Sequence, residues 1–481
     1  SGAVCNATTG EYKSVTSGDW GTASTWMTYN GSAWVIATLP PTSANNNITI
    51  QPGHVITVSG IQTADQLTVQ AGGTLSIVSG SLVVANGAGT DASIDGTLSL
   101  AGGALDGVGL VVINSSATLN WAGGTMQGQG STTISSGAIV NLTSTSFLSG
   151  QRVVNNNTNF TMQADIQMSG NPCGFNNGGT ILIDGDFGFL DNGASGCTLS
   201  NNSNGTINKI SGTGTSFLSN SAQIRFSNLG TLNVSTGAIS INGINPVGNL
   251  FGTLSVSPGA NLTSPLNLGF SGTTIDNNGI ISFNQLEMNG STAQTITGNG
   301  TISALTINNS SAVTLNNEQT VSGSLTFTTG KLIASPGKAI LLAGATVTGA
   351  TYNSYVVGRL QRNITSPVLY EFPIGDIDAY APVVLINPFV TTSGGITINT
   401  AGEDHPAIAG SGIYPNKSVN RYWHLESNGA VISQYLLTVN WNSEDEDAGL
   451  NYGNLKAAQY NGVSWQFRGD DGYDNSSLLG I

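Results

Sequence analysis

The sequence predicts an all-β protein, a right-handed parallel β-helix followed by an antiparallel β-sandwich. The first observation behind this prediction is a repeated phrase: a Gly, then Thr or Ser, then an alternating apolar and polar run, as in Gly73–Ile77 and Gly96–Leu100. Thr74 and Thr97 of these two phrases lie 23 residues apart, and later phrases recur at similar intervals. A period in the low twenties is typical of a solenoid of stacked coils.

Short alternating runs and the lack of helical periodicity are the other two observations. Asn47–Ile50 and Val55–Val58 alternate apolar and polar residues, which is the pattern of half-buried strands, and Pro52-Gly53 between them is a turn signal. Gly, Ser, Thr and Asn dominate the composition, and these residues favour turns and strands over helices. Helical solenoids are therefore excluded.

Composition and charge restrict the partners that we expect. Only 8% of the residues are charged, the net charge is −14, and 12 residues are basic. A chain with so few Lys and Arg side chains has no stripe with which to neutralise phosphates, so nucleic acid and anionic membrane surfaces are disfavoured. No apolar run is long enough to span a bilayer.

Residues 1–45 are predicted to be an N-terminal aromatic cap. They contain Trp20, Trp26 and Trp34, followed by Pro40-Pro41. The first coil of a solenoid needs such a cover, because it otherwise exposes unpaired backbone and core. The alternative is that Trp20 and Trp34 stack against carbohydrate.

Residues 46–348 are predicted to form the parallel β-helix, with roughly 13 coils if the stretch from residue 48 to 340 is divided into coils of about 22 residues. Inward Leu, Ile and Val side chains would form ladders along the axis, and Asn side chains at turns would form hydrogen-bonded ladders. Candidates for the Asn ladders are Asn155–Asn157, Asn176-Asn177 and Asn277-Asn278.

Two of the three cysteines predict a disulfide. Cys173 and Cys197 are 24 residues apart, about one coil, and adjacent coils lie about 4.8 Å apart, within the range of Cα distances that a disulfide bridges. Such a bond indicates an exported protein. The alternative is a pair of buried thiols. Cys5 is left over, either free or linked to another chain.

Residues 349–481 are predicted to form the β-sandwich, with strands such as Tyr355–Arg362 and Tyr435–Trp441. The sequence stops at an apolar stub that looks like an unfinished strand. We expect a strand from another subunit or from a secretion partner to complete the sheet there. The candidate contact residues are Ser477, Leu478, Leu479 and Ile481.

Segments at both ends resemble one family. Trp20–Trp26, Pro40-Pro41, Asn47–Ile50 and Gly53–Val58 resemble the start of many large secreted β-helix proteins of Bacteroidota. Further segments are similar to a module that precedes a C-terminal sorting domain read by the type IX secretion system: Val357–Arg362, Tyr370–Gly375, Val419–Leu425 and Tyr460–Trp465. The resemblance implies export to the cell surface or medium, and no particular activity. The sorting domain itself is lacking, either cleaved on secretion or left out of this stretch.

The acidic residues suggest two candidate cation sites. Asp184 and Asp186, with Asp191 nearby, place oxygen ligands together, so either a Ca²⁺ site or a solvated loop is expected. The run Glu444–Asp447 is expected to be an exposed loop, with Ca²⁺ binding as the alternative. The three histidines, His54, His405 and His424, are too far apart in sequence to show metal-ligand spacing.

An enzyme is disfavoured, because the basic residues of the first two regions are scattered and the catalytic motifs of polygalacturonase-like β-helices are absent. We expect an extracellular structural or adhesive protein, a rigid surface stalk or fibre subunit, whose partners are the secretion machinery or copies of itself. The alternative is a carbohydrate-binding or polysaccharide-degrading β-helix. A third candidate is ice binding, which needs regular Thr-x-Thr rows that the sequence shows only irregularly.

Overall fold

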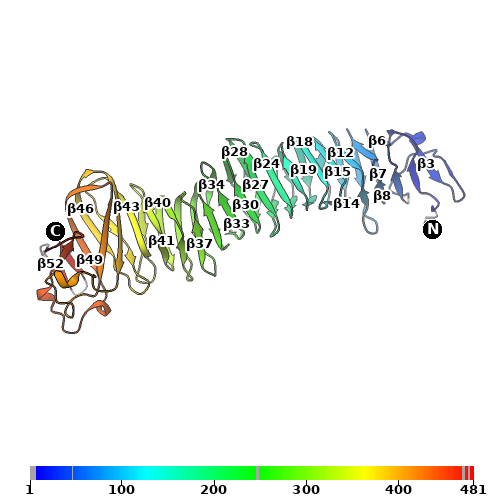
Figure 1. The fold of residues 1–481 in the computed structure, drawn as a ribbon. Coiled ribbons are helices and arrows are strands. Elements are labelled where there is room, and N and C mark those ends of the chain that lie inside the picture. Colours follow the sequence, from blue (N-terminus) through cyan, green and yellow to red (C-terminus); the bar gives the residue numbers. More distant parts are fainter. Residues whose placement is uncertain (1–6, 46, 245–248, 468–471, 475–476, 481) are drawn as a thin grey trace. The chain divides into compact units, whose positions relative to one another are not determined.

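A computed structural model describes residues 7–45, 47–244, 249–467, 472–474 and 477–480 of the chain. They form two compact units, Ser1–Leu266 (unit 1) and Asn267–Ile481 (unit 2). The predicted fold class is confirmed: a parallel β-solenoid of about 15 turns, with antiparallel sheets at the C-terminal end (Figure 1). The helices of the described residues are single 3₁₀ turns: η1 (Ala23–Thr25), η2 (Ile408–Gly410), η3 (Ser443–Asp445) and η4 (Tyr452–Asn454).

Most of unit 1 is a three-sided coil, with one strand of each turn in each of three parallel sheets. The first sheet contains β5 (Ile48–Ile50), β8 (Leu67–Val69), β11 (Ala92–Ile94), β14 (Leu110–Ile113), β17 (Ser131–Ile134), β20 (Val153–Asn156), β23 (Gly174–Asn177), β26 (Cys197–Asn201) and β29 (Ile224–Asn228). The second contains β7 (Ile61–Ala64), β10 (Ser81–Val84), β13 (Ala104–Gly107), β16 (Thr125–Met126), β19 (Ser146–Gly150), β22 (Ile166–Gly170) and β25 (Phe189–Asp191).

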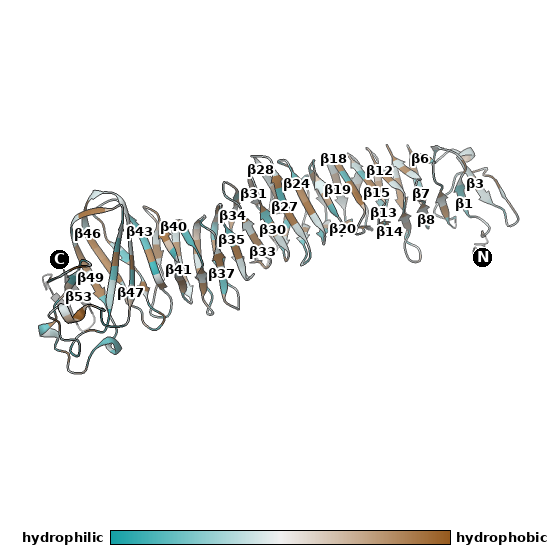
Figure 2. Cartoon of the chain, in the orientation of Figure 1, coloured by the Kyte–Doolittle hydropathy of each residue, from teal (hydrophilic) through white to brown (hydrophobic). Residues whose placement is uncertain are grey.

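The third sheet of unit 1 carries the repeated Gly-Thr phrase. Its strands are β6 (Val55–Val58), β9 (Thr74–Ile77), β12 (Thr97–Leu100), β15 (Thr118–Ala122), β18 (Ile139–Ser144), β21 (Asn159–Met162), β24 (Thr180–Asp184), β27 (Thr206–Ser211), β30 (Thr231–Val234) and β33 (Thr253–Val256). The remaining strands of unit 1 are β28 (Thr215–Ser219), β31 (Ala238–Ile241), β32 (Asn249–Leu250) and the start of β34 (Asn261–Phe270). Apolar and polar residues alternate along these strands (Figure 2).

The glycine of the phrase is required by the stacking of the coils. A Cβ atom added to Gly96 would lie 2.2 Å from the carbonyl oxygen of Gly73, and one added to Gly230 would lie 2.1 Å from that of Gly205. Any larger residue would push neighbouring coils apart at the corner that precedes the third sheet. The recurrent Gly therefore marks the points of closest approach between turns.

An inward column of the first sheet changes from aliphatic to amide side chains along unit 1. Ile50, Val69, Ile94, Ile113 and Ile134 stack in register on neighbouring strands. The next four positions of the column are fully buried asparagines: Asn156, Asn177, Asn201 and Asn228.

The amide column is a hydrogen-bonded ladder, as predicted for this stretch. Each side-chain amide donates to the next, with distances of 2.8 Å (Asn156 to Asn177), 2.8 Å (Asn177 to Asn201) and 2.7 Å (Asn201 to Asn228). The predicted ladder at Asn277 is different, because its amide donates to Gln319, 3.1 Å away, rather than to an asparagine. Buried amides are tolerated in a core when their hydrogen bonds are made along the stack.

The N-terminal region continues the first sheet. β1 (Tyr12–Ser14) pairs in parallel with β5 and antiparallel with β3 (Trp26–Tyr29), which pairs with β4 (Trp34–Ile36). The short β2 (Gly18–Asp19) pairs with β6. The first coil thus has its edges paired in two of the three sheets.

Unit 2 contains longer strands. Its parallel strands are β35 (Thr274–Asn277), β36 (Ile280–Met288), β37 (Gln294–Thr297), β38 (Thr301–Asn308), β39 (Val313–Leu315), β40 (Glu318–Thr329), β41 (Leu332–Leu341), β42 (Thr346–Thr348), β43 (Val356–Ile364) and β45 (Ile374–Gly375). Parallel pairing continues as far as Val357 with Gly375, beyond the predicted limit at residue 348. Strand β43 then also pairs antiparallel with β47 (Gly394–Ala401), so it is the strand at which the pairing direction changes.

The antiparallel strands complete unit 2. β47 pairs with β48 (Tyr422–Asn428), and a separate sheet has the order β44 (Tyr370–Phe372), β46 (Val383–Thr392), β49 (Val431–Asn440), β53 (Ser477–Gly480), β52 (Gly472–Asp474). A small hairpin joins β50 (Ala458–Tyr460) and β51 (Trp465–Phe467).

The prediction of an unfinished C-terminal strand is wrong for Ser477, Leu478 and Leu479. They belong to β53, which pairs antiparallel with β49 on one side and with β52 on the other. Because both edges of β53 are occupied within the chain, no place remains beside it for a strand from another subunit. Ile481 lies outside the described residues.

Candidate functional sites

The most regular surface of unit 1 is the outward side of the third sheet, which we call the Thr/Ser/Asn face. One row of this face lines up seven threonines that start successive strands, interrupted between Thr118 and Thr180 by Ile139 and Asn159. The row consists of Thr74, Thr97, Thr118, Thr180, Thr206, Thr231 and Thr253.

A second row runs beside the threonines, two residues further along each strand. Its members are Thr57, Ser76, Ser99, Asn120, Asn141, Thr161, Leu182, Asn208, Asn233 and Ser255. The side-chain amide of Asn141 donates to Asn120 along the row, at 2.7 Å. No residue of either row is charged. The face pairs a Thr row with a mostly Ser and Asn row, so it lacks the Thr-x-Thr pattern that ice binding needs.

A shallow groove of about 280 Å³ interrupts the Thr/Ser/Asn face between β18 and β21. The short pairing between these two strands, which covers only Asn141 with Thr161 and Leu142 with Met162, opens the sheet there. Ile139 at the edge of the groove is 53% exposed. Ile139 and Asn159, the two residues that interrupt the Thr row, both line this groove.

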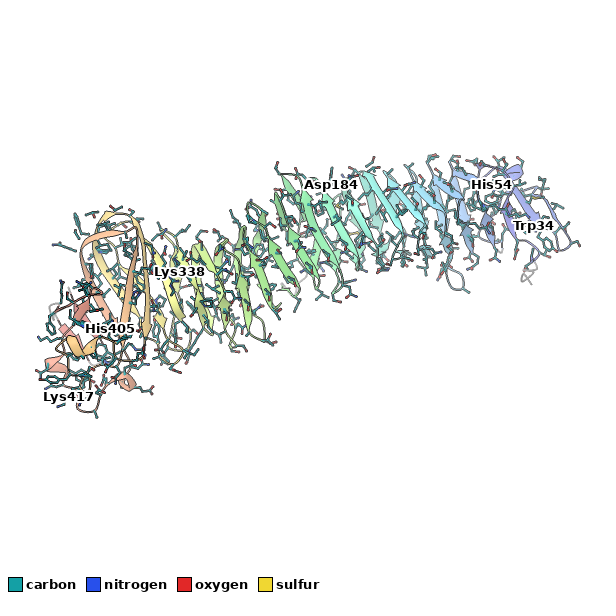
Figure 3. All side chains as sticks on the ribbon, viewed as in Figure 1. Trp34, His54, Asp184, Lys338, His405 and Lys417 are labelled. Atoms are coloured by element: carbon teal, nitrogen blue, oxygen red, sulfur yellow. A yellow bond between two sulfur atoms is a disulfide. The ribbon has the colours of Figure 1, made fainter. Side chains whose placement is uncertain are left out.

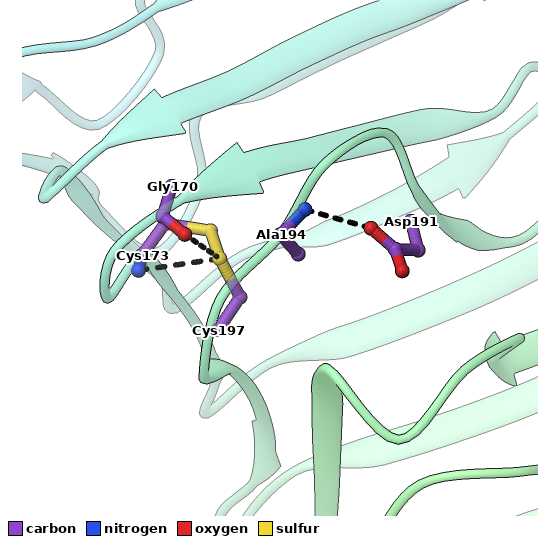
Figure 4. The surroundings of a disulfide bond; sticks show 5 residues. All are labelled: Gly170, Cys173, Asp191, Ala194 and Cys197. Atoms are coloured by element: carbon purple, nitrogen blue, oxygen red, sulfur yellow. Dashed lines mark hydrogen bonds between the residues drawn. A yellow bond between two sulfur atoms is a disulfide. The ribbon is translucent and has the colours of Figure 1, made fainter.

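The structure contains a disulfide between Cys173 and Cys197, as their spacing predicts, with Cα atoms 4.5 Å apart (Figure 4). Cys197 begins β26, and Cys173 lies just before β23 on the preceding turn. The bond therefore joins two neighbouring coils of unit 1. Cys5 lies outside the described residues.

The three aspartates predicted as Ca²⁺ ligands have separate partners. Asp184 accepts hydrogen bonds from Ser211 Oγ and Gln163 Nε2, which lower the pKa of its carboxyl group. Asp186 pairs with Lys209 Nζ at 2.8 Å.

Asp191, the third predicted ligand, accepts from Ser221 Oγ at 2.6 Å and from the Ala194 amide at 2.7 Å (Figure 4). Over the part of the chain that the structure describes, no three His, Cys, Asp or Glu side chains gather into a metal-binding group. The structure therefore does not bring Asp184, Asp186 and Asp191 together as one site.

The structure corrects the prediction that Glu444–Asp447 is an exposed loop, because side chains of this run form hydrogen bonds with other residues of unit 2. Asp445 is buried and accepts two hydrogen bonds from Arg421, Nε to Oδ2 at 2.8 Å and Nη2 to Oδ1 at 3.0 Å. Arg421 also pairs with Asp376 at 2.7 Å. Glu446 accepts from Trp441 Nε1 and from the Tyr452 hydroxyl. Arg421 and Asp445 are 24 residues apart in the sequence, and no motif signals their pairing.

The two tryptophans predicted to stack on glycans differ. Trp20 is fully buried, packs edge-to-face on Trp26 with ring centroids 5.0 Å apart, and donates to the Pro41 carbonyl, so it is a core residue and the glycan prediction for it is wrong. Trp34 is partly exposed, and its ring contacts Tyr29 at 5.6 Å and Lys13 Nζ at 4.3 Å (Figure 3). Only Trp34 keeps an accessible ring.

Sequence reasoning treated the basic residues as scattered, and missed that several are buried. Arg152 is fully buried in unit 1 and donates to Thr132 Oγ1 at 3.1 Å and to the Gln127 carbonyl at 3.0 Å. Its burial lowers its pKa to about 10. Lys209 is also fully buried, and Lys338 in unit 2 is nearly so. Only the side-chain contacts of the folded chain reveal these positions.

The histidines have structural neighbours. His54 Nδ1 lies 2.8 Å from Ser14 Oγ, and the His405 ring packs against Tyr422, Tyr460 and Trp465 with centroids 4.9–5.0 Å away. His424 is an exposed residue of β48. The His54 and His405 environments are those of a hydrogen-bonded and a packed side chain.

No described helix is both long and apolar enough to cross a membrane. A scan of protein-family models, a search of curated proteins and a search of solved structures found no match to this chain. The resemblance to Bacteroidota surface proteins therefore stays a prediction.

Proposed function

We propose that this protein is an extracellular structural or adhesive element, a rigid cell-surface stalk or fibre subunit. The observation that carries the proposal is the in-register stacking of the coils in unit 1, with a continuous inward column of aliphatic and amide side chains. Such stacking joins every turn to the next through backbone hydrogen bonds that run along the coil axis. Resistance to deformation along that axis is the property a stalk or fibre needs.

The charged side chains support a structural role over a catalytic one. Arg152, Lys209 and Arg421 are buried and held by carbonyl oxygens, hydroxyls or carboxylates of the chain. Groups that are fully engaged in this way act as clamps between turns and loops. An active site would instead present a nucleophile, acid or base to a pocket.

The disulfide supports an extracellular location. A bond between neighbouring coils persists in oxidising compartments and is rare in reducing ones. Export by a type IX-like route, and a source among Bacteroidota, rest on the sequence resemblance alone.

The Thr/Ser/Asn face is the surface we assign to contact with neighbouring copies. Its hydroxyl and amide groups have no charge to desolvate, so burying the face against an identical face costs less than burying ionic groups. A Thr206→Asp/Thr231→Asp double variant adds like charges to two neighbouring strands of the face, and should prevent lateral assembly while leaving the coil folded.

Light scattering and negative-stain electron microscopy at rising protein concentration test this contact. We expect ordered assemblies from the unmodified chain and none from the double variant. A Ser200→Asp/Ser227→Asp variant places the same charges on the first sheet and serves as the matched control, which should still assemble. Equal behaviour of all three proteins would contradict the assigned face.

The second candidate is glycan binding, which one observation favours: the accessible Tyr29 and Trp34 rings lie together in the N-terminal region. A glycan array with the unmodified chain and a Trp34→Ala variant tests it. Binding that disappears in the variant would support a carbohydrate ligand, and binding that persists in it would exclude these rings as the site.

A further inference from the structure

Unit 2 contains a buried cluster of reactive side chains where the pairing of β43 changes from parallel to antiparallel. Lys338 is on β41, Gln361 is on β43 and Thr397 is on β47, which are three successive neighbours in the sheet. The Lys338 side chain is only 8% exposed, and Gln361 and Thr397 are 9% and 1% exposed. Lys338 is labelled in Figure 3.

The geometry aims an amine at a carboxamide. Lys338 Nζ donates to Gln361 Oε1 at 3.1 Å, and the same nitrogen lies 3.0 Å from Glu318 Oε1. Glu318 is the register partner of Lys338 on β40. The cluster thus combines a nucleophile, an electrophilic carbonyl group and a carboxylate within hydrogen-bonding distance of the nucleophile, which are the groups that amide formation uses.

Two further contacts hold the carboxamide. Thr397 Oγ1 lies 3.2 Å from Gln361 Oε1 and 2.6 Å from Asn428 Oδ1. When its single proton turns from Asn428 to Gln361, the hydroxyl would stabilise negative charge that develops on Oε1. The Gly395 backbone lies directly against the Gln361 amide group. A Cβ atom added to Gly395 would lie only 2.4 Å from Gln361 Nε2. A carboxamide fixed in this way loses little freedom on reacting, which favours the intramolecular step.

We propose that Lys338 and Gln361 become joined by an isopeptide bond, with release of ammonia and with Glu318 as the proton carrier. The Glu318 carboxylate takes a proton from the Lys338 ammonium group, and the freed Nζ lone pair attacks Gln361 Cδ. The Cδ–Nε2 bond then breaks. Nζ loses two protons in this reaction. Both leave with Nε2 as ammonium, one of them after transfer through Glu318. The step therefore needs no co-reactant.

The position of Glu318 suits this role, since its side chain is 53% exposed. A carboxylate at the boundary with water exchanges protons with solvent, while Lys338 and Gln361 remain covered. Lys209 offers an internal comparison: it is also buried and paired with a carboxylate, Asp186, but no carboxamide is among its hydrogen-bond partners. Lys209 should therefore stay unmodified.

The bond would connect turns of the chain much as the disulfide does. Lys338 and Gln361 are 23 residues apart, and Cys173 and Cys197 are 24 apart. Each unit would then have one covalent link between neighbouring turns. The link in unit 2 would not depend on redox conditions.

Mass spectrometry of the full chain, folded, then denatured and reduced, is the direct test. We expect a mass lower than the sequence mass by one ammonia, and a branched tryptic peptide that joins the segments around Lys338 and Gln361. Trypsin should not cleave after Lys338 but should cleave after Lys209. A folded chain with the full sequence mass and cleavage at Lys338 would overturn the proposal, as would ammonia loss located at any other residue.

Variants separate the chemistry from the fold. Lys338→Arg keeps the ion pair with Glu318 but should restore the sequence mass, and Glu318→Gln should slow the appearance of the branched peptide. Circular dichroism shows whether each variant is folded. A branched peptide that forms at an unchanged rate in folded Glu318→Gln would contradict the role of Glu318. If Lys338→Arg does not fold, the peptide map of the unmodified chain still decides.

Discussion

Different interactions stabilise unit 1 and unit 2. In unit 1 short strands stack in register, glycines mark the closest approaches, and an amide ladder continues the aliphatic core. In unit 2 the strands are longer and change direction, and four of the five ion pairs among the described residues lie there. Unit 1 also contains two fully buried cations, Arg152 and Lys209, and a disulfide, so the units differ in how many ion pairs they contain rather than in whether they use charged side chains.

The largest effect we expect is in unit 2, from removing the cation that holds two carboxylates. Arg421→Met leaves Asp376 and Asp445 without their partner, which should cost about 3–5 kcal/mol of local stability. Hydrogen exchange of the full chain should show lost protection around β47, β48 and η3. Unit 1 should be unchanged; equal loss in both units would contradict the division between them. Lys417→Met, an exposed cation in the same region, is the control.

Reducing the disulfide should weaken unit 1 by about 2–4 kcal/mol, because the open chain regains the freedom of a 24-residue loop. A Cys173→Ser/Cys197→Ser variant separates this effect from reduction at Cys5. Urea unfolding followed by exchange at β23 and β26 measures it. An unchanged midpoint would mean that coil stacking alone sets the stability there.

Interrupting the amide ladder should have a smaller effect. Asn177→Ala removes the partner of both Asn156 and Asn201, and leaving buried polar groups without partners costs about 1–3 kcal/mol. Asn176→Ala on the outward side of the same strand removes one partly exposed hydrogen bond and should change stability by less than about 0.5 kcal/mol. Equal urea midpoints for the two variants would show that the inward amide ladder contributes no more to stability than the outward hydrogen bond.

Acid should loosen unit 2 around Arg421. Burial raises the pKa of Asp376, but the hydrogen bonds from Arg421 and from the Ala379 amide outweigh it, so the folded pKa is lowered. The ionised carboxylate therefore stabilises the fold above the unfolded pKa of about 4, and this contribution is lost as the pH falls through the lower folded value. Exchange rates, corrected for their intrinsic pH dependence, should rise there below about pH 4, and the Arg421→Met variant should lack this change.

The fold could be predicted where the sequence repeats, and the contacts that lie outside the repeat could not. The Gly-Thr period and the Cys173–Cys197 spacing report local geometry that recurs every turn, so they carried over into the structure. The pairing of Arg421 with Asp445, and the lysine aimed at Gln361, depend on strands that meet only after β43 changes direction. Likewise, the sequence predicts an unfinished strand at the chain end, because the antiparallel pairing of β52 with β53 produces no repeat in the sequence.

Immunogold electron microscopy of intact producing cells, with antibodies to the Thr/Ser/Asn face and to the N-terminal region, tests the proposed function most directly. A surface stalk or fibre subunit predicts label along projections outside the cell, lost on deletion of the gene. In assembled fibres the face antibody should label less than the N-terminal one, because the face is buried between copies. Label confined to the cell interior, or dispersed in the medium without filaments, would contradict the proposal.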